Sequence, residues 1–159
     1  LDKEIEDRFQ AHPDMAIFDS FPGAGPALAP RLLAAMGSNR NRFESVSEIQ
    51  QYSGIAPVTD RSGKHVWIHR RFACPKFLRQ TFHEFAGQSR KWSGWARGYY
   101  DMQRSKGKGH HAAVRSLAYK WIRIIFRCWK DRIAYNEEIH LHSLRKKGSQ
   151  VLDFIAKAA

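Results

Sequence analysis

The chain has 159 residues, with 27 Lys or Arg against 15 Asp or Glu, which gives a formal net charge of +12. That length suits one domain with a sizeable core, and 43% hydrophobic with 13% aromatic residues excludes a disordered basic tail. The sequence has no apolar run of the roughly 18–20 residues that span a bilayer, and no signal peptide opens it. Cys74 and Cys128 have no C-x-x-C spacing, which excludes a disulfide framework or a zinc ribbon. We expect a protein of the reducing cytoplasm and, because the first residue is Leu1 rather than Met, a piece of a longer protein.

The charge is concentrated in the later part of the chain. Residues 1–60 hold 5 Lys/Arg and 9 Asp/Glu, a net charge of −4, whereas residues 61–159 hold 22 and 6, a net charge of +16. A surface this basic attracts polyanions, and phosphate contacts would make binding fall steeply with salt. The asymmetry favours a nucleic-acid partner over a protein that is merely rich in basic residues.

The predicted elements begin with a helix over residues 1–10, in which Leu1, Ile5 and Phe9 lie on one side. This segment could be the end of a connecting, coiled-coil helix. Pro13 then disfavours helix at the residue before it, so we place a boundary after residue 12.

Residues 16–36 predict two helical pieces around a tight turn that contains Gly23 and Gly25. Two glycines one residue apart allow positive φ and turn successive N–H groups outward at a helix start. Such groups, with the positive end of the helix dipole, bind phosphate. The turn is therefore interpreted either as a helix-hairpin-helix motif or as an ordinary helix–helix turn.

The next helix begins at Ser45, where Ser45 and Glu48 form a capping box, and Gly54 supplies its left-handed end. A loop follows, with Ser62–Gly63 at its tip. Residues 65–69 alternate polar and apolar side chains, as in a short strand.

The remaining elements are predicted to be helices, over residues 72–90, 92–102, 110–132 and 135–147. The longest, 110–132, has an apolar stripe with the spacing of a core-facing helix. A flexible positive loop, 105–109, precedes it. We predict an all-α fold with a helix-hairpin-helix-like element and at most one short β-hairpin: a main domain over residues 13–147 and a frayed tail over residues 148–159.

Ser62 is the candidate nucleophile, because it lies in a polar run with no apolar residue that would require burial. A serine hydroxyl attacks only when its proton is removed or its target is strongly polarised. Arg61 and Lys64 could neutralise a phosphodiester beside it. On local sequence alone, the same run is more typical of a solvated turn.

Metal sites have little support in the sequence. No H-E-x-x-H run or Cys/His spacing typical of zinc is present, and the six acids after residue 60 are scattered. A two-metal nuclease site needs several carboxylates that converge on ions about 4 Å apart. We therefore expect no metal ligands or cofactor in this chain, and histidines that face solvent or nucleic acid.

An aromatic run is interleaved with Lys and Arg and consists of Trp92, Trp95, Tyr99 and Tyr100. It could stack unpaired bases. Its helical spacing equally fits a core face, which is the interpretation we favour.

Four runs occur in a recognisable order: FDSFPGAGPALAPRLLAAMG, RFESVSEIQQYSGIAP, RSGKHVWIHRRFACPKFLRQTF and WARGYYDMQRSKGKGHHAAVRSLAYKWIRIIF. Together they resemble the C-terminal domain of transposases of the insertion-sequence 110/116/902 group, also called bridge-RNA-guided recombinases. The similarity covers roughly residues 15–135.

The resemblance implies a nucleophilic serine in the loop after a Y-x-G-x-x-P segment. Tyr52, Gly54 and Pro57 match that segment, and Ser62–Gly63 match the serine and its glycine. Ser62 is then expected to attack a DNA phosphodiester and form a covalent link. Divalent metal, Mg, is expected on four acids of a RuvC-like N-terminal domain outside this chain.

The family's K-x-G-N-x-x-L-R pattern is matched at Leu78–Arg79, with Ala73 and Cys74 in place of Gly and Asn and Arg70 or Arg71 in place of Lys. Residues of the basic region before the longest helix match the family as well. The residues expected to contact nucleic acid are Gly23, Gly25, Arg61, Lys64, Arg70, Arg71, Arg79, Lys106, Lys108 and His110.

The function predicted is the nucleophile-bearing and nucleic-acid-binding domain of a DNA transposase, inactive without its metal-binding partner domain. Its expected partners are DNA and a guide RNA, with no membrane, and the full-length protein is expected to be a homo-oligomer associated with the bacterial nucleoid. Two alternatives stay open: a non-catalytic helix-hairpin-helix module, and a basic structural protein.

Overall fold

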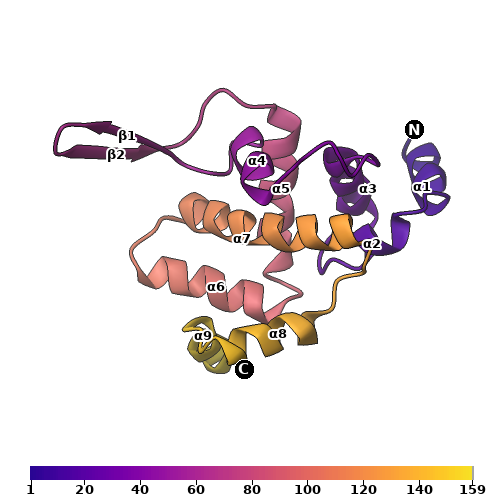
Figure 1. Ribbon diagram of the computed structural model, residues 1–159. Helices are drawn as coiled ribbons and strands as arrows, with labels where there is room; N and C mark the ends of the chain where they lie inside the picture. The colour runs from indigo at the N-terminus through magenta and orange to yellow at the C-terminus, as the bar shows by residue number, and fades with distance from the viewer. Residues whose placement is uncertain (159) are drawn as a thin grey trace.

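The computed structural model describes residues 1–158, which form nine helices and one two-stranded sheet (Figure 1). The elements are α1 (Asp2–Gln10), α2 (Met15–Asp19), α3 (Gly25–Met36), α4 (Val46–Tyr52), β1 (Val58–Ser62), β2 (His65–His69), α5 (Lys76–Ser89), α6 (Gly94–Ser105), α7 (His110–Asp131), α8 (Glu137–Lys146) and α9 (Val151–Ala158). The predicted fold class, mostly helical with one short hairpin, is confirmed. None of the described helices combines the length and apolar content that crossing a bilayer requires.

Helix α7 lies at the centre and packs against α4, α5 and α6 (Figure 1). Its predicted apolar stripe is confirmed, because Val114, Leu117, Trp121, Ile125 and Trp129 are all buried. Since most of helical stability in proteins comes from packing such a face rather than from intrinsic propensity, α7 is the element on which its neighbours assemble.

Short-range signals in the sequence explain where several helices begin and end. Ser45 accepts a hydrogen bond from the N–H of Glu48, as the capping box predicts, although the Glu48 carboxylate reaches the N–H of Glu44 rather than that of Ser45. Gly37 and Gly54 have φ of +77° and +74°, in the left-handed region that ends a helix.

Two predicted boundaries between residues 55 and 90 are wrong. Residues 58–62, predicted as loop, form strand β1, because their backbone pairs with residues 65–69 in register. Helix α5 begins at Lys76 rather than at residue 72, because Pro75 takes an extended conformation and proline also disfavours helix at the residue before it.

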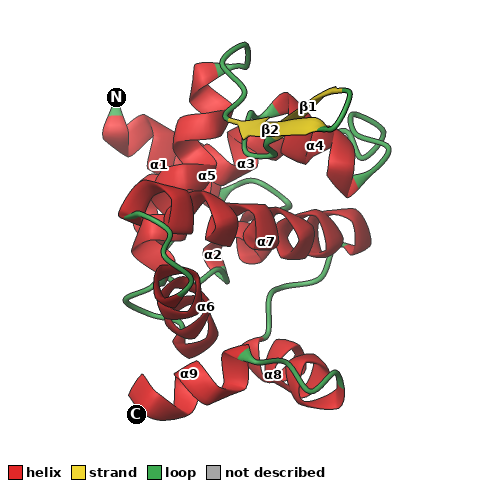
Figure 2. Cartoon of the chain, turned by 90° about the vertical axis from the view of Figure 1, so that its left-hand side faces the viewer, coloured by secondary structure: helices red, strands yellow, loops and turns green. Residues whose placement is uncertain are grey.

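The C-terminal segment is ordered, so the predicted fraying of residues 148–159 is wrong for residues 151–158. Helix α9 packs on α6, where a Cβ added to Gly98 would lie 2.9 Å from Cγ1 of Ile155. Figures 1 and 2 both place α8 and α9 beyond α6, on the side of the molecule away from the hairpin. The missing side chain at Gly98 lets α9 approach closely.

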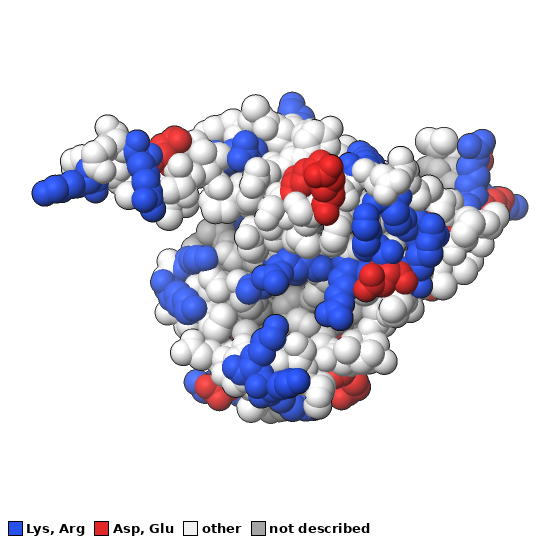
Figure 3. Space-filling view, viewed as in Figure 1, with Lys and Arg blue, Asp and Glu red and all other residues white. Residues whose placement is uncertain are grey.

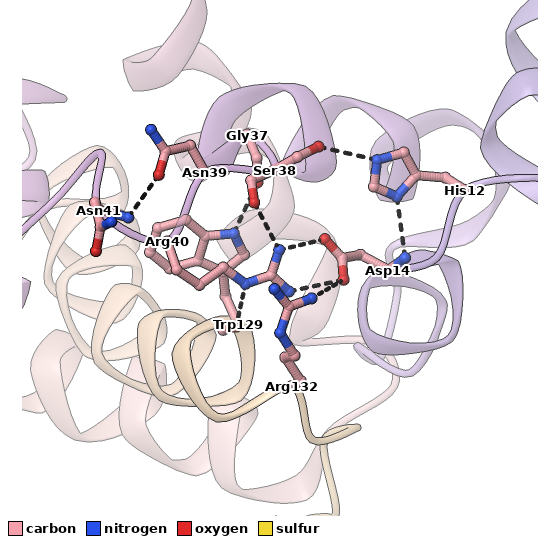
Figure 4. Close-up of polar contacts among 9 residues, drawn as sticks. All are labelled: His12, Asp14, Gly37, Ser38, Asn39, Arg40, Asn41, Trp129 and Arg132. Carbon is pink, nitrogen blue, oxygen red and sulfur yellow. Dashed lines mark hydrogen bonds and ion pairs between the residues drawn. The ribbon is translucent and has the colours of Figure 1, made fainter.

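A buried ion pair joins the start of α2 to the loop after α3 (Figure 4). The Arg40 guanidinium donates to both carboxylate oxygens of Asp14, at 2.6 and 2.7 Å, and its Nε donates to the carbonyl of Trp129 at 3.0 Å. The Asp14 side chain is only 4% exposed. Hydrogen bonding from Arg40 holds the pKa of Asp14 below its usual value, so the carboxylate stays charged inside the fold.

We predict that Arg40→Ala lowers the free energy of unfolding by about 3 kcal/mol, because it leaves a buried carboxylate without its main partner. Arg97→Ala is the matched control, since Arg97 forms an exposed i,i+4 pair with Asp101 and such pairs contribute at most about 1 kcal/mol. Urea denaturation of both variants at pH 7 measures the difference.

The same prediction has a pH signature with a defined sign. Because the folded-state pKa of Asp14 is lowered, the stability that it contributes is present above its unfolded pKa of about 4 and declines as the pH falls below it. The gap between wild type and Arg40→Ala should therefore narrow below pH 4. Equal losses of stability in Arg40→Ala and Arg97→Ala would show that the Arg40–Asp14 pair does not hold α2 to the loop after α3.

Candidate nucleic-acid interface

The β-hairpin stands out from the helical body and presents its tip to solvent (Figure 1). β1 and β2 are antiparallel, with Ser62 opposite His65 and a two-residue loop, Gly63–Lys64, between them. Gly63 has φ of +59°, and glycine with positive φ in the first position of a two-residue loop is typical of a type II′ turn. The turn that the glycine allows therefore sets the position of Ser62.

Ser62 is the last residue of β1 and is exposed at the tip. Within residues 1–158, no side chain forms a hydrogen bond with its hydroxyl, and His65 across the strand pair is not hydrogen-bonded to it. A serine in this position can be reached by an extended polymer. The described chain supplies no base bonded to its proton.

The hairpin has one acidic residue, Asp60, and His69 is paired with its carboxylate. His69 Nε2 lies 2.6 Å from the Asp60 carboxylate. The hydrogen bond with Asp60 is the main reason that the pKa of His69 lies above its usual value. The hairpin therefore presents Arg61 and Lys64 to solvent without an acid that opposes them.

An open groove lies between the base of the hairpin, the Gly54–Pro57 segment and one face of α7. Its lining includes no Asp or Glu and five basic residues, which are Arg70, Arg71, Lys108, Arg115 and Lys120. We call it the basic groove. Figure 3 shows Lys and Arg spread from the hairpin tip across this face of the molecule, with separate groups of Asp and Glu between them.

Two cations of the basic groove are partly buried and have other cations nearby. Burial and the nearby Arg70 lower the pKa of Arg115. Burial lowers the pKa of Lys120 too, together with Arg123 and Lys147. Uncompensated positive charges that repel one another are stabilised by an anion that comes between them.

The groove and Ser62 are connected through the hairpin. The amide of Gln50 donates to the carbonyl of Tyr119 at 2.9 Å, which fixes α4 to α7. Thr59 lines the groove, and Ser62 lies three strand residues beyond it, about 10 Å at the usual rise per residue. A polymer in the groove can therefore extend along the hairpin toward Ser62.

The structure brings together only part of the predicted nucleic-acid-binding set. Arg70, Arg71 and Lys108 line the basic groove, whereas Arg61 and Lys64 lie at the hairpin tip. Lys106 is exposed at the end of α6. Arg79 is half-buried on α5, where its Cδ would contact a Cβ added to Gly54.

His110 begins α7, and its Nδ1 lies 2.7 Å from the Tyr100 hydroxyl. Its ring also lies 5.1 Å from that of His111. Desolvation and the nearby Arg90 lower the pKa of His110, which favours its neutral form. No three His, Cys, Asp or Glu side chains among the described residues gather as a metal-binding cluster.

Gly23 and Gly25 lie apart from the basic groove, in the turn between α2 and α3. Both have positive φ, as predicted. A Cβ at Gly23 would lie 2.9 Å from Cδ1 of Trp92, whereas the space around Gly25 is open. The turn thus forms a separate surface.

The aromatic run on and before α6 divides between core and surface. Trp95 is buried at 2% exposure, so the core interpretation is confirmed for it, but it is wrong for Trp92, which is 71% exposed. Trp92 precedes α6, outside the helical periodicity on which the interpretation depended.

Sequence reasoning did not assign Arg115 and Lys120 to the site. They could have been recognised from the spacing of the α7 residues that line the groove. These residues recur every three or four positions and are Ala112, Arg115, Ser116, Tyr119 and Lys120. This spacing marks one helix face. It could have been found by considering the face opposite the apolar stripe.

Comparison with known proteins gives a consistent result. The family described as "Transposase IS116/IS110/IS902 family" matches residues 15–101. The IS117 mini-circle protein of Streptomyces coelicolor is 34% identical over 87% of this chain and 33% of its own length. The 42 kDa protein of insertion element IS900 from Mycobacterium paratuberculosis is 31% identical over 85% of this chain and 34% of its own length. The chain spans about a third of the length of these relatives.

We predict that Gly54→Ala disrupts the segment that leads into the hairpin. A Cβ there would lie 2.9 Å from Cβ of Cys74 and closer still to its Sγ, and the left-handed backbone adds about 1–2 kcal/mol for a residue other than glycine. Gly148→Ala is the matched control, with φ of +60° and open space around it. Thermal unfolding should show the larger loss for Gly54→Ala. Equal losses would mean that the contact with Cys74 has no role.

Proposed function

Because the chain belongs to the IS116/IS110/IS902 family of transposases, we propose that it is the nucleophile-bearing, nucleic-acid-binding part of a DNA transposase. In this proposal Ser62 attacks a DNA phosphodiester, and the basic groove holds the backbone of the same polymer. The observation that carries it is the exposed Ser62 at the tip of a hairpin whose base opens into a groove lined by five basic residues and no acid.

The proposed reaction is a transfer of the phosphodiester to serine. The Ser62 Oγ–P bond forms, the bond from phosphorus to the leaving sugar oxygen breaks, and the serine proton leaves to a base while the leaving oxygen gains a proton. Phosphoryl transfer depends mainly on positioning and charge stabilisation. Lys64, in the turn beside Ser62, is close enough along the chain to offset charge on the phosphorus oxygens, whereas Arg61 points to the opposite face of the hairpin.

The remaining parts of the reaction are assigned to residues outside the described chain. Divalent metal, Mg, on the acids of a RuvC-like domain would supply further charge neutralisation. The base that accepts the serine proton would come from that side as well. The guide RNA and an oligomeric full-length protein belong to the same proposal.

A second candidate function is a binding module without a nucleophile. The absence of a hydrogen-bonded base for Ser62 among residues 1–158 favours it. The positive φ angles of Gly23 and Gly25 are compatible with it, because a helix-hairpin-helix turn needs such a backbone. In that case the basic groove binds nucleic acid and the hairpin serine takes no part in chemistry.

We predict that the 159-residue chain binds DNA with strong salt dependence, and that Lys120→Ala lowers the slope of log K against log salt by about 1, because it removes one phosphate contact. Lys3→Ala, on α1 far from the hairpin (Figure 1), removes the same charge outside the groove and should leave the slope unchanged. Fluorescence anisotropy at several salt concentrations measures both. The same slope in both variants would contradict a role for the groove.

We predict that Ser62→Ala, in a transposase that contains this chain with its metal-binding domain, abolishes covalent protein–DNA adducts and changes DNA affinity less than twofold. Ser47→Ala is the control, because Ser47 is an exposed serine on α4. Denaturing gels of protein with labelled DNA detect the adduct. Adducts that persist in Ser62→Ala would remove Ser62 from the mechanism and favour the alternatives without a nucleophile.

A further inference from the structure

One face of the hairpin carries a series of flat rings beside Ser62. Residues directly opposite in a strand pair share a face, and so do alternate residues along each strand. The register therefore places Ser62, His65, Trp67 and His69 on one face, with Arg61, Val66 and Ile68 on the other. Trp67 lies diagonally across from Ser62, at a spacing of about 7–8 Å for such pairs.

The rings on and beside this face form two stacked pairs. The His65 and Trp67 rings lie 5.9 Å apart at 24°, and the His69 and Phe72 rings lie 6.5 Å apart at 19°. The guanidinium of Arg70 lies over the Phe72 ring at 5.2 Å. A row of planar groups thus extends from the hairpin tip to the mouth of the basic groove.

Core packing does not account for these rings. Trp67 is 54% exposed and Phe72 is 72% exposed, and neither belongs to the hydrophobic core. The fold would lose little by replacing either side chain. Trp67 is also unlike Trp95, Trp121 and Trp129, which are buried.

The charge around the rings indicates what they bind. Arg61 and Lys64 flank the tip and Arg70 lies at the base, while the single acid, Asp60, is paired with His69. A partner that complements this surface has flat apolar faces and a regular negative charge. A nucleotide strand has both, because bases stack on aromatic rings while cations hold the phosphates.

We propose that Trp67, supported by His65, is a stacking platform for one unpaired DNA base next to the phosphodiester at Ser62. This inference rests on the proposed function and deepens it. In a duplex both faces of a base are covered by its neighbours, so a protein ring stacks on a base only where that nucleotide is unstacked. The substrate at the hairpin is therefore a strand opened at the attacked position, and Trp67 is a positioning residue.

The test compares single-stranded and duplex DNA of one sequence, bound to the 159-residue chain at fixed salt and followed by fluorescence anisotropy. Trp67→Ala should weaken binding of the single strand by roughly 5- to 150-fold, the range for loss of one stacked base, and binding of the duplex by less than twofold. Trp67→Phe keeps a ring and should retain most of the affinity. Val66→Ala changes an exposed apolar residue on the opposite face of the same hairpin and should have no effect.

Tryptophan fluorescence distinguishes stacking of Trp67 on a base from a merely structural role of this residue. Stacking on a base should quench the emission of Trp67, so the single strand should reduce tryptophan fluorescence in wild type and reduce it less in Trp67→Phe, even though that variant still binds. A merely structural role would leave the quenching of the two proteins equal at saturation.

The outcomes also separate this inference from the proposed function. Loss of affinity for both DNA forms in Trp67→Ala, or for neither, would overturn the stacking platform while leaving the basic groove and Ser62 in place. Absence of DNA binding by the wild-type chain would instead contradict the proposed function itself.

Discussion

The burial of Trp121 is the interaction on which the rest of the structure depends. Its ring contacts Phe21 before α3, Phe85 of α5, Trp95 of α6 and Tyr135 after α7, and its Nε1 donates to the hydroxyl of Ser89 at 2.8 Å. Aromatic pairs of this kind contribute about 0.5–1.5 kcal/mol beyond their burial. Because one side of α7 is committed to this cluster, its other side is left to the basic groove.

Positive charge has two different roles in the molecule. Arg40 is placed against the buried carboxylate of Asp14, where the pair joins α2 to the loop after α3. Arg115 and Lys120 have no acid among the residues that line their groove, and their neighbours are cations. The Arg40–Asp14 pair stabilises the fold without a ligand. The repulsion among the cations of the groove, in contrast, would be reduced by a bound polyanion. The net charge of +12 therefore bears on function.

The features that could be predicted from the sequence are those that depend on residues close together in the chain. The cap at Ser45, the positive φ of Gly23 and Gly54 and the stripe of α7 each depend on residues within a few positions. A short hairpin was allowed for, but the residues of strand β1 were assigned to a loop because their polar sequence lacks alternation. Helix α9 was missed because its stability depends on Gly98, more than fifty residues away. The groove was missed for the same reason, since Arg70 and Arg115 meet only in the folded chain.

The position of Ser62 was predicted, but its surroundings were not. The tip of the loop was predicted around Ser62–Gly63, whereas the register that places Trp67 on the same face as Ser62 could only come from the strand pair.

The most direct test of the account is to trap the covalent intermediate of a transposase that contains this chain on nicked suicide DNA, and to locate the modified residue by mass spectrometry. The account predicts a nucleotide adduct on Ser62. An adduct on any other residue, with Ser62 unmodified, would contradict it.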